Sequence, residues 1–218
     1  MIRLLVCALL LTGPAAAADL PAAPDLKVAT WNLEWLTERP PGDPGLPKDV
    51  QPKRAEDIET LRRYALLLDA DVVAFQEVDG AAVVARVFPP DLYRILITGD
   101  RVTQRVGFAV RRGLRVVQNP DLAALDVAEP GRNRLRSGAD ITLDLPGGRL
   151  RLLAVHLKTG CHEARLSTPT RNCEALRLQV APLQGWIAQR REEGVRSRVW
   201  GVDGPLDGVR VLAIDIGA

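Results

Sequence analysis

The sequence lacks an excess of charge of either sign. Lys and Arg number 29 against 27 Asp and Glu, which leaves a formal charge of +2 over 218 residues. This balance gives no argument for a nucleic-acid partner on charge alone. Aromatic residues are also scarce, at 4%, and they do not alternate with basic residues as in platforms that stack single strands.

Long apolar runs are absent too. A membrane-spanning helix needs about 20 consecutive apolar residues, whereas the N-terminal run covers only residues 4–11, with Pro14 close behind. Arg3 precedes this run and small residues follow it at 15–18, which is the order of a cleavable secretory signal peptide. We therefore expect a signal peptide at residues 1–18, a leader at 19–26 and one domain at 27–218. The mature protein is then periplasmic or secreted.

Cysteine is rare, and one of the three, Cys7, would leave with the signal peptide. Cys161 and Cys173 would remain, with His162 between them. In a reducing compartment this group would suggest zinc, but the spacing matches no standard zinc pair and a fourth ligand is missing. Export to an oxidising compartment favours a Cys161–Cys173 disulfide instead.

The apolar pattern contains no internal repeat and alternates between strands and helices. Strands are expected at residues 28–31, 72–75, 93–98, 105–111, 139–145 and 149–156, and helices at 53–68, 81–88 and 174–191. Residues 37–47 hold four prolines and two glycines, which excludes regular structure there. In the last helix, Pro182 should produce a kink or a restart. The buried face of that helix should carry Leu176, Val180, Leu183 and Ile187.

Three strands end in a polar residue where an apolar one would continue the pattern. Asn32 follows the first strand, Glu77 follows the second, and His156 ends the sixth. An Asn at a strand end often caps a turn, and a single His is often structural. The alternative is a site, because amide and carboxylate oxygens bind divalent cations and α/β sheets place ligands beyond the strand ends.

Three segments together resemble the endonuclease/exonuclease/phosphatase family. They are Trp-Asn-Leu-Glu-Trp-Leu at 31–36, Asp-Val-Val-Ala-Phe-Gln-Glu-Val at 71–78 and Leu-Ala-Val-His-Leu-Lys at 153–158. The match runs from about residue 27 to about residue 191. Its relatives include pancreatic-type deoxyribonuclease, apurinic endonucleases, sphingomyelinases and inositol-polyphosphate phosphatases. The resemblance implies an α+β fold, a four-layer α-β-β-α sandwich with two mixed β-sheets.

The resemblance also implies metal-assisted hydrolysis of a phosphate ester. Asn32 and Glu77 would hold Mg²⁺, with Mn²⁺ or Ca²⁺ as alternatives, and His156 would act as an acid/base residue at the scissile phosphate. Glu34 would either support these ligands or be an ordinary surface residue. The substrate stays open among nucleic acid, a phospholipid head group and a small phosphoester, and we expect a monomer.

The C-terminal part departs from the family pattern. The family has a Gly-Asp-Phe-Asn segment and then a Ser-Asp-His segment, which position the nucleophilic water and take its proton. This chain offers only Asp203 as an echo, and no histidine follows His162. We therefore expect an incomplete fold with a divergent tail at 199–218, produced by a frameshift, by truncation or by genuine divergence. Two functions stay open: an exported metal-dependent phosphoesterase, or a catalytically dead binding module or nonfunctional fragment.

Overall fold

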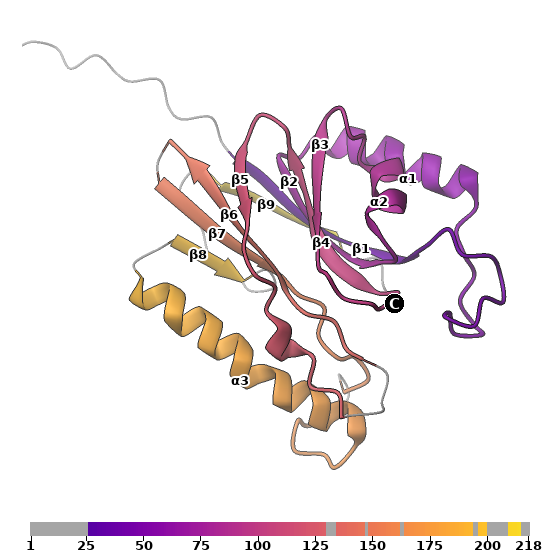
Figure 1. The fold of residues 1–218 in the computed structure, drawn as a ribbon, viewed down its shortest axis with the longest axis vertical. Helices are drawn as coiled ribbons and strands as arrows, with labels where there is room; N and C mark the ends of the chain where they lie inside the picture. The colour runs from indigo at the N-terminus through magenta and orange to yellow at the C-terminus, as the bar shows by residue number, and fades with distance from the viewer. Residues whose placement is uncertain are drawn as a thin grey trace, which may run out of the picture.

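The computed structural model describes residues 26–129, 134–146, 148–161 and 164–193, and the backbone of 196–199 and 209–214. The expected signal peptide, the leader up to residue 25, His162 and Asp203 lie outside these residues. Within them the chain forms two β-sheets and three α-helices (Figure 1), so the α+β class is confirmed.

The first sheet has the strand order β3-β4-β2-β1-β9. Its strands are β1 (Leu26–Leu36), β2 (Val72–Val78), β3 (Tyr93–Ile97), β4 (Arg105–Arg111) and β9 (Val209–Ile214). β1 runs parallel to β2 and β9, and β4 runs antiparallel to β2 and β3. β9 comes from the tail whose sequence diverges from the family pattern, so that tail supplies a neighbour for β1.

The second sheet has the strand order β5-β6-β7-β8. Its strands are β5 (Arg115–Gln118), β6 (Ala139–Leu145), β7 (Gly148–Ala154) and β8 (Arg196–Val199). β6 and β7 form the expected hairpin, paired from Leu145 and Gly148 back to Ala139 and Ala154. The expectation that β7 ends in His156 is wrong, because this strand stops at Ala154 and His156 lies two residues beyond it.

The three helices lie on two sides of the molecule (Figure 1). α1 (Ala55–Leu68) and α2 (Ala81–Val87) lie on one side of the molecule, and α3 (Arg171–Glu192) lies along the second sheet (Figure 1). α1 buries Ile58, Ala65 and Leu68, as its apolar spacing predicts. α3 continues through Pro182 as a single helix, so of the two expected outcomes, a kink or a restart, the restart does not occur.

The predicted buried face of α3 is wrong. The fully buried residues of this helix are Cys173, Gln179, Trp186 and Arg190, whereas Leu176, Val180, Leu183 and Ile187 are only half-buried. The physical reason lies in the opposing sheet, where the buried carboxylate of Asp140 accepts a hydrogen bond from Trp186 Nε1 at 2.7 Å. A polar partner on the sheet therefore selects polar and amphipathic residues on the helix, and apolar periodicity misses them.

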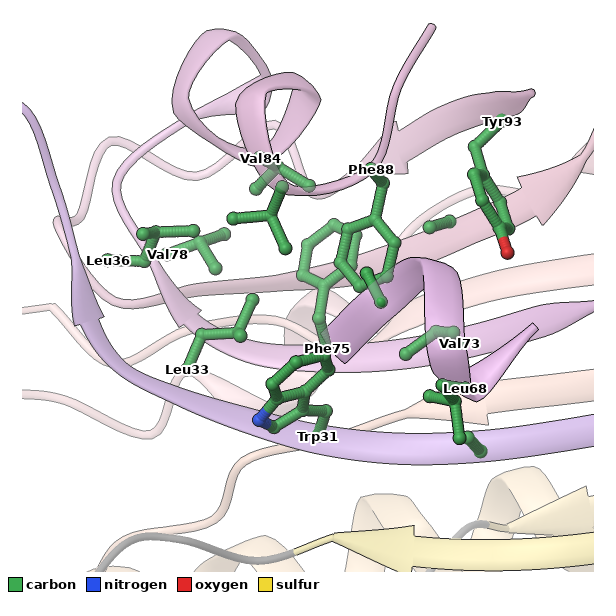
Figure 2. Close-up of a cluster of buried hydrophobic side chains, with 14 of the residues drawn as sticks. Trp31, Leu33, Leu36, Leu68, Val73, Phe75, Val78, Val84, Phe88 and Tyr93 are labelled. Atoms are coloured by element: carbon green, nitrogen blue, oxygen red, sulfur yellow. The ribbon is translucent and has the colours of Figure 1, made fainter. Parts of the chain in front are cut away.

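β1 and β2 are buried on both faces, as expected of parallel strands between layers. Val28, Val72 and Ala74 face a core that they share with Ile141 and Leu152 of the second sheet. The alternate residues of the same strands face a second core beneath α1 and α2 (Figure 2). One apolar core packs against each face of β1 and β2 and holds both strands in place.

Phe88 lies at the centre of the second core. Its ring centroid lies 6.2 Å from Trp31, 6.4 Å from Phe75 and 5.6 Å from Tyr93. Figure 2 shows Trp31, Phe75 and Tyr93 around Phe88, and the Phe88 ring is stacked on Phe75 and edge-on to Trp31 and Tyr93. Offset and edge-on aromatic contacts of this kind stabilise a core beyond the area that they bury.

None of the helices in the described part of the chain has the length and hydropathy of a membrane-spanning segment.

Candidate functional site

The regular pairing of β1 and β2 breaks at one level of the first sheet. The strands pair in register as far as Asn32 and Gln76, and pairing resumes only at Leu36 and Val78. Between these points Glu77 has a left-handed backbone, with φ of 60°. Such a conformation is costly for a residue with a Cβ atom. Asn32 and Glu77 therefore lie inside β1 and β2 and do not follow them as expected, because both strands continue past the break. Irregularities of this kind in a strand pair redirect side chains.

This break brings the two predicted metal ligands together. Asn32 Nδ2 donates a hydrogen bond to Glu77 Oε1 at 3.0 Å, and Asn32 Oδ1 accepts one from the backbone N–H of Glu34 at 3.0 Å. Glu34 therefore supports Asn32 through its backbone. Its carboxylate is exposed and pairs with Lys53 Nζ at 3.4 Å, which places that side chain at the surface.

The Glu77 carboxylate is only 13% exposed and is held by neutral groups. Asn32 contacts Oε1, Gln104 Nε2 donates to Oε2 at 2.8 Å, and His156 Nε2 lies 3.3 Å from Oε1. Among the described residues, no lysine or arginine forms an ion pair with it. A largely buried carboxylate without a cationic neighbour in contact is suited to bind a cation.

His156 is uncharged at neutral pH. Burial, together with the positive charges of Arg136 and Lys158, lowers its pKa to about 3. A carboxylate 3.3 Å away favours the protonated ring, but burial and the two cations outweigh it. The ring therefore faces Glu77 as a neutral imidazole that can carry a proton on one nitrogen.

Two further residues of the site escaped the sequence analysis. Gln104 immediately precedes β4, and Arg136 lies three residues before β6. Arg136 donates to the carbonyl oxygens of His156 and Leu157 at 2.7 and 3.3 Å and to Gln104 Oε1 at 3.1 Å. Burial lowers its pKa to about 10, so the guanidinium stays charged at neutral pH.

The segment that follows His156 is fixed by α3. Gln179, which is 1% exposed, accepts from the backbone N–H of Lys158 at 2.8 Å and donates to the carbonyl of Leu125 at 2.7 Å. The predicted disulfide between Cys161 and Cys173 is present, with an S–S distance of 2.02 Å. It joins this segment to the first turn of α3, so the helix holds the chain beyond His156 at two points.

The donors around Glu77 fit a hard divalent cation better than zinc. Within the described residues, no group of three or more His, Cys, Asp and Glu side chains could hold a metal. Mg²⁺ commonly binds through one or two carboxylates and keeps several waters, whereas protein zinc sites take three or four His, Cys or acidic ligands. Glu77 offers one carboxylate and Asn32 one amide oxygen, which is sufficient for the first kind of ion.

A hollow of about 510 Å³, lined in part by Lys158, lies between the loop before β6 and the start of α3. Its lining includes the cations Arg134, Lys158 and Arg171, but also the carboxylates Glu129 and Glu174. The mixed signs give no preference for a long polyanion over a small phosphoester.

No protein-family model and no curated protein matches the chain. Among solved structures, it is similar to an endonuclease/exonuclease/phosphatase family protein from Bacteroides thetaiotaomicron. The TM-score is 0.51 at 14% sequence identity, over 81% of this chain and 62% of that chain.

Two further solved structures are similar over about half of their own length. A Beutenbergia cavernae DSM 12333 endonuclease/exonuclease/phosphatase gives a TM-score of 0.47 at 20% identity, over 84% of this chain and 50% of that one. D. rerio TDP2 complexed with single-strand DNA product gives a TM-score of 0.48 at 19% identity, over 78% of this chain and 56% of that chain.

The chain spans 50 to 62% of the length of these three solved structures. The likeness to the Bacteroides protein concerns the fold. The chain has an endonuclease/exonuclease/phosphatase-like fold, as its three motifs predict.

Proposed function

We propose that this chain is a divalent-metal-dependent phosphoesterase. The observation that carries the proposal is the meeting of three separate segments at Glu77, whose carboxylate oxygen Oε1 contacts both Asn32 and His156. In this proposal α1 and α2 on one side, and α3 on the other, are the outer layers of a four-layer α-β-β-α sandwich.

Asn32 and Glu77 would hold Mg²⁺, or Mn²⁺ or Ca²⁺ in its place. When bound, the ion supplies Lewis-acid polarisation of a phosphoryl oxygen. Glu77 provides the negative charge of the site, and its neutral neighbours orient both carboxylate oxygens. Asn32 contributes its amide oxygen and is held in place by the backbone of Glu34.

His156 would stabilise the substrate through a hydrogen bond. Its neutral ring, with a pKa lowered to about 3, can donate from Nε2 to a non-bridging phosphate oxygen. Donors that are already oriented towards developing charge lower the barrier because they need no reorganisation during the reaction. The same nitrogen contacts Glu77, so the substrate oxygen and the metal ligand would share one neighbourhood.

The proposed setting is the periplasm or the outside of the cell, and the proposed state is a monomer. Export rests on the N-terminal signal-peptide pattern, and the disulfide suits an oxidising compartment. The substrate class stays open among nucleic acid, phospholipid head groups and small phosphoesters.

The test combines binding with turnover. We expect the purified chain to bind Mn²⁺ saturably in a calorimetric titration, and Glu77→Gln to weaken binding at least tenfold, because the ligand charge is removed. Asp43→Asn is the matched control, since this carboxylate lies in the loop beside Arg39. Plasmid DNA and bis-p-nitrophenyl phosphate, with Mg²⁺ or EDTA, then report hydrolysis. Equal Mn²⁺ affinity in wild type and Glu77→Gln would falsify the metal site.

A second candidate is an exported module that binds but does not turn over its ligand. The observation that favours it is the absence of the family's Asp-x-Asn and Ser-Asp-His segments from these 218 residues. Losing one general base costs about 10²- to 10⁴-fold. Saturable Mn²⁺ binding that depends on Glu77, without hydrolysis of either substrate, would select this candidate.

A further inference from the structure

Three consecutive residues after β7 have backbone groups that the sheet cannot satisfy. β7 ends at Ala154, so the carbonyls of His156 and Leu157 and the N–H of Lys158 need other partners. Arg136 donates hydrogen bonds to both carbonyls, and Gln179 accepts one from the N–H of Lys158. The position of the His156 ring therefore depends on side chains from elsewhere in the fold.

Arg136 is suited to hold two successive carbonyls. A guanidinium presents five donors in a planar fork with fixed geometry, and a lysine ammonium does not. Nε and Nη2 of Arg136 serve the two carbonyls, and Nη1 stays free for a third acceptor. That acceptor is Gln104 Oε1, at 3.1 Å.

The third contact sets the orientation of the Gln104 amide. Arg136 can only donate, so Gln104 must turn its oxygen towards the guanidinium and its NH₂ group towards Glu77 Oε2, 2.8 Å away. The reverse orientation would set NH₂ against guanidinium and oxygen against carboxylate. Arg136 thereby fixes one edge of the Glu77 carboxylate without touching it.

The contacts close a ring. From Arg136 one path leads through Gln104 to Glu77 Oε2, and the other leads through the His156 backbone and imidazole to Glu77 Oε1. We propose that Arg136 is the positioning residue of this site, setting both the carboxylate that would bind the metal and the histidine that would meet the substrate. This inference rests on the proposed metal site at Glu77.

A positioning role and a purely structural role predict different results for Arg136→Lys. The lysine keeps the charge but cannot make the three-way fork. Residues that support metal ligands typically change metal affinity by about 10- to 100-fold when replaced. We expect Arg136→Lys and Arg136→Met to raise the Mn²⁺ dissociation constant by about that factor. Arg151→Lys is the matched control, because Arg151 binds the buried Asp140 by two 2.8 Å hydrogen bonds in a pair without contact to Glu77.

A metal-free readout tests the histidine branch. The chain has two histidines, so His162→Gln in every variant leaves the ¹⁵N imidazole signals of His156 alone. We expect one tautomer in the wild-type background and a shifted mixture in Arg136→Lys. Gln104→Met is a second variant that cuts only the carboxylate branch. It should weaken Mn²⁺ binding while leaving the His156 signals unchanged.

The outcomes separate this inference from the proposed function. Weaker Mn²⁺ binding and altered His156 signals in Arg136→Lys, with Arg151→Lys like wild type, support the positioning role. Unchanged affinity and unchanged signals in a folded Arg136→Lys overturn it, whatever its melting temperature. If wild type and Glu77→Gln bind Mn²⁺ alike, the metal site fails, and the ¹⁵N signals alone then decide: altered signals support Arg136, and unaltered ones overturn it.

Discussion

Burial controls the protonation of His156 and ties it to stability. Its pKa is lowered to about 3 in the folded protein, against about 6.5 in an unfolded chain. The folded state therefore binds fewer protons between these values, and its stability falls as the pH drops from 6.5 towards 3. The slope from this one group reaches at most about 1.4 kcal/mol per pH unit.

We expect His156→Gln to remove that slope. Urea unfolding of wild type and variant at pH 7, 5.5 and 4.5 measures it. The variant should lose less stability than wild type across this range, while acids common to both proteins cancel in the difference. Parallel pH profiles would mean that His156 titrates normally in the folded protein.

The residues of the site differ in how far sequence alone could reveal them. Asn32 and Glu77 break an apolar strand pattern, and this visible irregularity led to the correct expectation that their side chains meet. Gln104 and Arg136 precede strands instead of following them. Because β4 is antiparallel to β2, and β6 to β7, their starts lie beside the ends that carry the site. Strand direction had to be known before these two residues could be found.

At the scale of elements, the sequence predicts buried apolar surfaces better than buried polar ones. The face of α1 follows its apolar spacing, because that helix packs on an apolar core. The buried residues of α3 include Gln179, Trp186 and Arg190 instead, and Trp186 meets the buried carboxylate of Asp140 on the second sheet. The short strand β5 was not predicted, since four residues hold too little periodicity to be recognised.

In β4, which pairs with β2 on one side and β3 on the other, there is no room for a side chain at Gly107. A Cβ atom there would lie 2.3 Å from the carbonyl oxygen of Leu96 and 2.6 Å from the ring of Phe75. We expect Gly107→Ala to destabilise the protein by about 1–3 kcal/mol or more, because an overpacked core must shift. Urea denaturation measures the loss. Gly113→Ala is the matched control, since a Cβ there meets nothing within 4 Å, and equal stabilities of the two variants would contradict the steric argument.

At the scale of the whole molecule, the site spans both sheets. Glu77 belongs to the first sheet, and His156 follows the last paired residue of β7 in the second. Their 3.3 Å contact therefore depends on the apolar core between the sheets. Any change that moves one sheet relative to the other should affect the site before it unfolds the protein.

The disulfide is one of the attachments that hold this arrangement. Cys161 and Cys173 enclose a short loop of twelve residue steps, so the chain-entropy model gives a contribution of at most about 3 kcal/mol. We expect the Cys161→Ser, Cys173→Ser double variant to lose up to that amount in urea denaturation. Wild type unfolded in reductant should match the variant. A wild type whose stability reductant leaves unchanged would contradict the Cys161–Cys173 bond.

The left-handed backbone at Glu77 has a consequence for how this protein could evolve or be engineered. Glycine adopts φ of 60° without the penalty that glutamate bears there. Replacing Glu77 by glycine would also remove the free-energy cost of burying a carboxylate. Selection for thermal stability alone would therefore favour glycine over glutamate at this position. Variants recovered from such a screen would be expected to have a higher melting temperature and to lack the proposed metal ligand, so thermal stability and the proposed activity make opposite demands on this residue.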